Sequence, residues 1–234
     1  MESSGRKRRC YCAFGQKNNL DYHCLLEIKD TYITIAKATD EILFKEKSSK
    51  FYGYAFPIES EEEVKPIIEQ LRKLHPHAVH YCYAYQIGTE KISYRANDDG
   101  EPNNSAGAPI YGQIQSFGLT NVLLVVVRIF GGIKLGVGGL ISAYKTTAQL
   151  VLEEAEIIEK TIDTPFLISF DYKNMNKVMR VIKEKKLDII TQTMELDENS
   201  GIAMGKIEIK TRKKNAEFIF DIFDNLFEIE IKRL

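Results

Sequence analysis

The sequence has no long apolar run and no excess of either charge. A membrane helix needs about 18 consecutive apolar residues, and the apolar runs of this chain are much shorter. The formal net charge is −1, so the chain as a whole favours neither nucleic acid nor a membrane surface. The basic residues at positions 6–9 are not followed by the apolar stretch of a secretory signal. We therefore expect a cytoplasmic protein without a membrane partner.

Cysteine is also scarce, with four residues in a chain of 234. A disulfide framework is not expected in a chain of this size. Cys10, Cys12, His23 and Cys24 could be drawn as metal ligands, but their spacing matches no common zinc pattern. The sequence therefore predicts no cofactor.

Residues 1–29 show neither a helical nor a strand period. They are predicted to be an unstructured head, or an extension that does not belong to the folded unit. A start site assigned too early would explain such a head. Mass spectrometry that finds the head intact in the native protein would contradict that hypothesis.

The rest of the chain has the composition of a globular protein, with 44% hydrophobic and 28% charged residues. We predict an α+β fold with two domains, residues 30–162 and residues 163–234. In the first domain, runs rich in β-branched and aromatic residues predict strands. These runs are 32–36, 42–44, 51–56, 81–87 and 92–95.

Helices of the first domain are marked by their start signals. Ser60 and Glu63 form a capping-box pattern before an amphipathic segment. A second helix is predicted at about 105–116, after a polar turn. The apolar run 122–127 predicts a strand that is buried on both faces. A long helix is predicted to follow, with its buried face on residues between 140 and 151.

The second domain changes the order of elements. Residues 163–234 read as β-α-β-β-α-β, with a turn at 197–201 between the two middle strands. This order is the ferredoxin-like split β-α-β arrangement.

A glycine-rich loop joins the apolar strand to the long helix. Backbone N–H groups that converge at a helix start attract anions, and glycines permit a close approach. The loop is neither a P-loop nor a dinucleotide fingerprint, because the spacing is wrong for both. Glycines that only permit tight packing of strand against helix remain the alternative. The candidate residues for binding phosphate or RNA are Ser105, Gly107, Arg128, Gly131, Gly132, Lys134, Gly136, Gly138, Gly139 and Tyr144.

A second cluster comes from the polar turn and a nearby histidine. Asp98, Asp99 and Glu101, with His80, could bind a divalent cation or act as acid and base. The alternatives are a solvated turn, or acidic partners for Arg128. Because no nucleophile with a matched base can be assigned, we lean towards a protein that is not an enzyme.

Cys82 and the three histidines before it can be explained by structure alone. Cys82 lies in a strand-like run and is predicted to be a core residue. His75, His77 and His80 surround Pro76, which breaks any helical spacing, so a helix end that enters a strand explains them. Of the three, His80 is expected to point into a cleft.

Several of these segments together resemble the IMPACT/YigZ family. They are Asp98 to Pro102 with Ala106-Gly107, the run from Val125 to Gly132, the run from Leu135 to Leu140, Ala143-Tyr144, Lys50-Phe51, and His75-Pro76 to His80. The resemblance covers about residues 30–234. It implies a first domain like the second domain of a small-subunit ribosomal protein. It also implies a second domain like the last domain of elongation factor G.

The same resemblance implies regulation of translation, with RNA, the ribosome or a translation factor as partner. Eukaryotic relatives restrain an initiation-factor kinase through an additional N-terminal domain, which is not recognised here, so that role is not carried over. The chain also departs from the family pattern. It has Asn104-Ser105 where the family often has Gly-Thr, and Ala108 where the family often has a basic residue. The loss of that basic residue moves the expected anion contact towards Arg128 and the glycine-rich loop.

Three functional hypotheses follow from the sequence. The first is a non-enzymatic regulator of translation that binds RNA or the ribosome through the glycine-rich anion site. The second is a metal-assisted enzyme that acts on a phosphate-bearing or peptide substrate. The third is a protein-interaction module that uses the ferredoxin-like sheet. The sequence does not set the oligomeric state.

Overall fold

The computed structural model describes residues 30–196 and 203–234. The predicted head at 1–29 and the predicted turn at 197–201 lie outside these residues. The N-terminal part contains β1 (Thr31–Ile35), β2 (Ile42–Glu46), β3 (Ser49–Pro57), α1 (Val64–Leu74), β4 (His80–Ile87), β5 (Ser93–Asn97), α2 (Gly107–Ser116), β6 (Val122–Ile129), α3 (Gly136–Glu154) and β7 (Ile157–Thr161). The C-terminal part contains β8 (Asp163–Asp171), α4 (Met175–Lys185), β9 (Asp188–Leu196), β10 (Ala203–Arg212), α5 (Ala216–Asp224) and β11 (Ile229–Arg233).

Local signals in the sequence set several of these boundaries. The capping box forms as predicted, since Glu63 accepts a hydrogen bond from the backbone N–H of Ser60 at 2.9 Å. The hairpin between β2 and β3 turns at Lys47 and Ser48, which both have positive φ. His75 follows α1 and His80 begins β4, so a helix end does lead into a strand there.

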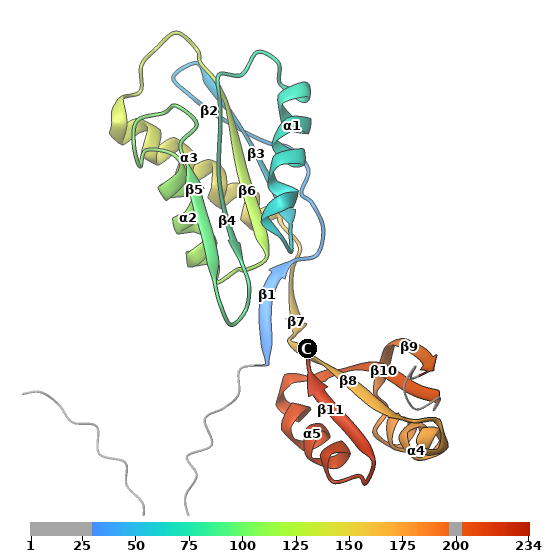
Figure 1. Ribbon diagram of the computed structural model, residues 1–234. Helices are drawn as coiled ribbons and strands as arrows, with labels where there is room; N and C mark the ends of the chain where they lie inside the picture. The colour runs from blue at the N-terminus through green and yellow to red at the C-terminus, as the bar shows by residue number, and fades with distance from the viewer. Residues whose placement is uncertain (1–29, 197–202) are drawn as a thin grey trace, which may run out of the picture.

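Five strands of the N-terminal part form one sheet in the order β2-β3-β6-β4-β5. Every neighbouring pair in this sheet is antiparallel. Helices α2 and α3 cover one face and α1 covers the other (Figure 1). The central strand β6 is buried on both faces, as predicted: Val122, Leu124 and Val126 pack under α2 and α3, and the alternate residues pack under α1.

Strand β1 leaves this sheet and pairs with β7 in a two-stranded antiparallel ribbon. Strand β7 was not predicted from the sequence. It is short, and its partner β1 lies more than a hundred residues earlier in the chain, so no local pattern identifies the pairing.

The C-terminal part has the predicted order β-α-β-β-α-β, and its sheet has the order β11-β8-β10-β9. Its core is separate from that of the N-terminal part and includes Phe166, Ile168, Ile207 and Phe223. Gly205 on β10 lies against Phe170, because a Cβ at this position would come within 2.7 Å of the ring. No helix within the described ranges is long and apolar enough to span a membrane.

Candidate functional site

The acidic turn begins with Asp98, which caps the start of α2. Its carboxylate accepts backbone N–H groups from Asn104, Ala106 and Gly107, each at 2.9 Å. The N–H groups of Ala106 and Gly107 lie at the start of the helix, where a negative charge is favourable. Both oxygens of Asp98 are therefore used to fix the turn onto α2.

The small residues before α2 are required by close packing. A Cβ on Gly107 would lie 2.6 Å from the backbone nitrogen of Asn97. The side chain of Ser105 is fully buried and donates to the carbonyl oxygen of Pro102 at 2.6 Å. Both were candidate ligand-binding residues, and the structure gives each of them a role in closing the turn.

Asp99 ties the turn to the start of β4. Its carboxylate accepts the backbone N–H of Tyr81 at 2.7 Å and lies 3.4 Å from the guanidinium of Arg72. Its backbone carbonyl is 2.8 Å from Nδ1 of His80. A carbonyl can only accept, so Nδ1 carries the proton. That arrangement leaves Nε2 of His80 facing Glu101, at 3.9 Å.

Glu101 lies at the centre of a buried polar network. Arg128 donates from Nη1 to Glu101 Oε1 at 2.6 Å, and the Tyr144 hydroxyl donates to the same oxygen at 2.8 Å. The guanidinium also lies over the rings of Phe51 and Phe130. Opposite charges that are removed from water must pair in this way. Of the two alternatives to a metal site, an acidic partner for Arg128 is confirmed for Glu101, whereas Asp98 and Asp99 have other partners.

Arg128 has one further buried group. Its Nε atom is buried and has no hydrogen-bond partner in the described part of the chain. The ion pair with Glu101 compensates the charge of the side chain. A direct contact between Arg128 and an external anion stays a prediction.

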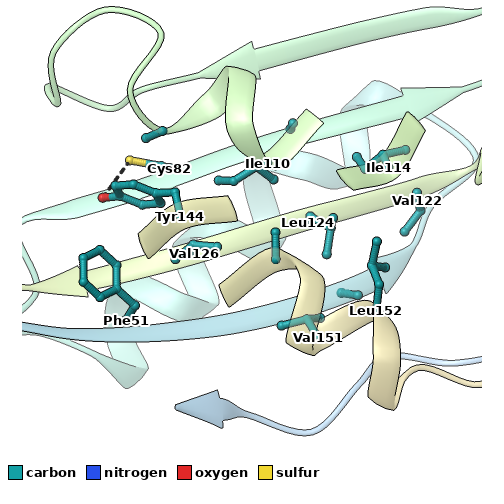
Figure 2. Close-up of a cluster of buried hydrophobic side chains, with 14 of the residues drawn as sticks. Phe51, Cys82, Ile110, Ile114, Val122, Leu124, Val126, Tyr144, Val151 and Leu152 are labelled. Carbon is teal, nitrogen blue, oxygen red and sulfur yellow. Dashed lines mark hydrogen bonds between the residues drawn. The ribbon is translucent and has the colours of Figure 1, made fainter. Parts of the chain in front are cut away.

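Cys82 and Tyr144 complete the network from the sheet and from α3 (Figure 2). Cys82 is fully buried, as predicted, and its Sγ lies 3.0 Å from the carbonyl of Asp98 and 3.3 Å from the Tyr144 hydroxyl. Burial raises the pKa of the Cys82 thiol and also that of the Tyr144 phenol. Both groups stay protonated at neutral pH, so Cys82 is a core residue and not a reactive thiolate.

Different structural requirements explain why glycine occupies several positions of the loop between β6 and α3. A Cβ on Gly131 would lie 2.1 Å from the backbone carbonyl of Ser48, so only glycine fits against the β2–β3 hairpin. Gly132 and Gly136 have φ of 87° and 73°, which favours glycine. Packing therefore explains part of the motif.

Gly138 is the exception among these glycines. It lies in the first turn of α3, has no positive φ, and would have no atom within 4 Å of an added Cβ. Gly139, its neighbour, is limited only by the Leu135 side chain at 3.1 Å. A glycine that the fold does not require, at an open helix start, leaves room for a ligand to approach the backbone.

The start of α3 is electrostatically open to an anion. No acidic residue lies in its first turn, and its N-cap residue Leu135 makes no side-chain cap hydrogen bond. Lys134 is exposed beside it and has no carboxylate within 4.0 Å in residues 30–196 and 203–234. The sequence from 102 to 152 contains no aspartate or glutamate. The helix dipole and Lys134 therefore meet no acidic residue from the first turn of α3, and Lys134 makes no ion pair among the described residues.

Exposed apolar side chains lie on the same loop and on the first turns of α3. Phe130, Ile133, Val137 and Ile141 are 46%, 52%, 53% and 38% exposed. The residues that we call the loop surface are these four with Lys134 and Lys145. None of the four apolar residues was predicted as a site residue. Val137 and Ile141 lie one helical turn apart, away from the buried Leu140 and Tyr144 positions, and that pattern could have identified them.

The structure thus divides the predicted site residues into three groups. The polar network around the acidic turn holds Asp98, Asp99, Glu101, His80, Arg128 and Tyr144. Ser105, Gly107 and Gly131 are close-packed positions. The loop and the first turn of α3 carry Gly132, Lys134, Gly136, Gly138 and Gly139. Within the described residues no group of three or more His, Cys, Asp or Glu side chains could hold a metal ion.

Known proteins are similar to this chain over the segments that form the site. The model of the Impact N-terminal domain matches residues 47–152. The IMPACT family member YvyE of Bacillus subtilis (strain 168) is 34% identical over 156 residues, covering 67% of this chain and 71% of that protein. The IMPACT family member YigZ of Escherichia coli (strain K12) is 33% identical over 134 residues, covering 56% of this chain and 66% of that protein.

A solved structure extends the match to both parts of the chain. The crystal structure of a hypothetical protein covers 88% of this chain and 98% of its own, with a TM-score of 0.66 and 24% sequence identity. At that identity the likeness shows a shared fold.

Proposed function

The chain belongs to the IMPACT family, and on this basis we propose that it regulates translation by binding RNA or the ribosome through the glycine-rich loop. Family membership supports the link to translation. The site itself is supported by one observation above all: α3 starts without a side-chain cap from its N-cap residue Leu135 and without an acidic residue in its first turn, beside the exposed Lys134. In this proposal the protein acts in the cytoplasm and by binding, not by catalysis.

The buried network has a supporting part in this proposal. The ion pair between Glu101 and Arg128 connects the acidic turn to the end of β6, where the loop begins. Tyr144 adds a hydrogen bond from α3, where the loop ends. Because both ends of the loop are held by one carboxylate, the N–H groups at the start of α3 are presented in a fixed position. Asp98 and Asp99 serve the same turn and are not assigned to a metal.

The domain analogies belong to the same proposal. An N-terminal domain like the second domain of a small-subunit ribosomal protein, and a C-terminal domain like the last domain of elongation factor G, would suit a ribosomal partner. The strand order of the C-terminal sheet is in keeping with the second analogy. Fold alone does not give function, so the loop carries the argument.

Co-sedimentation with purified ribosomes tests the proposal. We expect the full chain to pellet with ribosomes at low salt and to be released as salt increases, because phosphate contacts release counterions. Replacing Lys134 with alanine removes one such contact. It should lower the slope of log affinity against log salt by about 1. Lys65→Ala on the distant α1 is the matched control and should leave the slope unchanged. A wild-type chain that stays in the supernatant at low salt would contradict the proposal.

A further inference from the structure

Phosphate binding leaves part of the loop surface unexplained. An anion at the start of α3 needs N–H groups and Lys134, but it has no use for exposed isoleucine and valine. Ile133, Val137 and Ile141 nevertheless expose 52%, 53% and 38% of their surface beside that helix start. Large apolar side chains that gather on a surface mark a site where another molecule binds.

The chemistry of these side chains favours protein over RNA. Specific nucleic-acid interfaces are polar, and sequence-specific RNA sites stack bases on aromatic rings or on arginine. Aliphatic side chains provide neither stacking nor hydrogen bonds. The aromatic residue here, Phe130, has the Arg128 guanidinium over its ring at 5.5 Å. An aliphatic surface instead matches the apolar centre of a protein–protein interface.

The positive charges of the loop surface indicate that the partner is acidic. Lys134 and Lys145 are both exposed, and neither has a carboxylate within 4.0 Å among the residues that the structure describes. Lys145 lies one helical turn beyond Ile141 on α3, so it extends the stripe formed by Val137 and Ile141. The start of α3 adds a partial positive charge at the other end. A complementary partner would bring negative charge to both ends of an apolar contact.

We propose that the loop surface binds an acidic protein segment that carries aliphatic anchor residues. The anchors contact Ile133, Val137 and Ile141. The carboxylates of the segment face Lys134, Lys145 and the free N–H groups at the start of α3. Gly138, with open space where a side chain would be, lets the backbone of the segment approach. This inference rests on the proposed function, since it names the partner of the same surface within a ribosomal assembly.

Fluorescence polarisation with three labelled probes tests the inference on the full chain. The first probe is a short peptide in which glutamate alternates with leucine. The second is the same peptide with serine in place of leucine, and the third is an oligouridylate of equal charge. We expect the leucine peptide to bind roughly tenfold more tightly than either of the other two, because burying aliphatic groups adds to the charge contact.

Two variants locate the contact. Ile133→Ser with Val137→Ser should remove the preference for the leucine peptide while the weak binding of the serine peptide remains. Phe218→Ser, which removes a side chain that is 57% exposed on α5, is the matched control and should keep the preference. Because both changes lie on the surface, circular dichroism should show a folded protein in each case.

The inference is overturned if the leucine peptide binds no better than the serine peptide, or fails to bind. Tighter binding of oligouridylate would also overturn it and would favour RNA as the partner. These outcomes are separate from the fate of the proposed function. Loss of ribosome co-sedimentation contradicts that function, whereas the probe comparison depends on the loop surface alone.

Discussion

Arg128 and Glu101 form a buried ion pair at 2.6 Å between two segments that are separated in the chain. Arg128 is in the last part of β6, and Glu101 is in the turn that precedes α2. Their side chains are 6% and 4% exposed. In the low dielectric of a protein interior, each charge depends on the other for compensation.

Glu101→Gln tests this dependence. The change leaves the Arg128 guanidinium buried without an opposite charge, so the free energy of unfolding should fall by about 3–5 kcal/mol. Adding Arg128→Met should restore part of the loss, since no buried charge then remains. Urea unfolding measures both effects. Glu61→Gln breaks an exposed pair with Arg95 and should cost less than about 1 kcal/mol. Equal losses for Glu101→Gln and Glu61→Gln would refute the buried pair.

Two glycine substitutions separate packing from ligand access. Gly131→Ala places a Cβ against the backbone of Ser48 and should lower stability by at least about 2 kcal/mol, as overpacking does. Gly138→Ala meets no atom within 4 Å and should be neutral or raise stability by up to about 1 kcal/mol, because alanine favours a helix. Thermal unfolding checks both. Comparable destabilisation by the two changes would show that Gly138 is also a packing residue.

Stability is expected to fall in alkali, with tyrosine as the cause. Burial, assisted by Glu61, raises the pKa of Tyr85 to about 12, and burial also raises the pKa of Tyr144. An unfolded tyrosine loses its proton near pH 10. Above that pH the unfolded chain binds fewer protons than the native chain, so the free energy of unfolding decreases as pH rises. Below pH 10 a buried, protonated tyrosine makes its full contribution to the free energy of unfolding. For Tyr85 this contribution is lost as the pH rises towards 12.

Urea unfolding at a series of pH values between 8 and about 11.5 measures this slope. Tyr85→Phe and Tyr144→Phe should each make it shallower, because each removes one group that loses its proton at a lower pH in the unfolded chain than in the native chain. Tyr94→Phe, at a position that is 61% exposed, should leave it unchanged. A slope that is the same in all three variants would exclude the two buried tyrosines as its cause.

The sequence predicted those parts of the fold that have local signals. The capping box at Ser60 and Glu63 and the buried strand β6 each depend on neighbouring residues, and both are present. The β1–β7 ribbon was missed because it depends on residues more than a hundred positions apart. Pairing of that kind is decided by the three-dimensional arrangement: β1 lies in the predicted run 32–36, but no pattern in that run identifies β7 as its partner.

The sequence predicted most residues of the candidate site. It did not predict which of them form the polar network and which lie on the exposed loop. The acidic residues and the glycines were recognised from composition and spacing. Composition does not show that Asp98 caps α2. An acidic partner for Arg128 was one of the alternatives that the sequence left open, and the structure identifies it as Glu101. The apolar half of the loop surface was missed although the buried face of the helix was predicted, because Val137 and Ile141 were not compared with that face.

Gly138 offers the most direct measurement of the central claim, that the start of α3 is the site of contact with an anionic partner. Gly138→Glu and Gly138→Lys both place a long side chain in open space. Glutamate in the first turn of a helix is stabilising, so Gly138→Glu should remain folded. In co-sedimentation with ribosomes we expect Gly138→Glu to bind roughly tenfold or more weakly than wild type, as expected when one charge contact is replaced by repulsion. Gly138→Lys should bind at least as well as wild type. If both variants bind like wild type, the start of α3 is not the contact, and the account is contradicted.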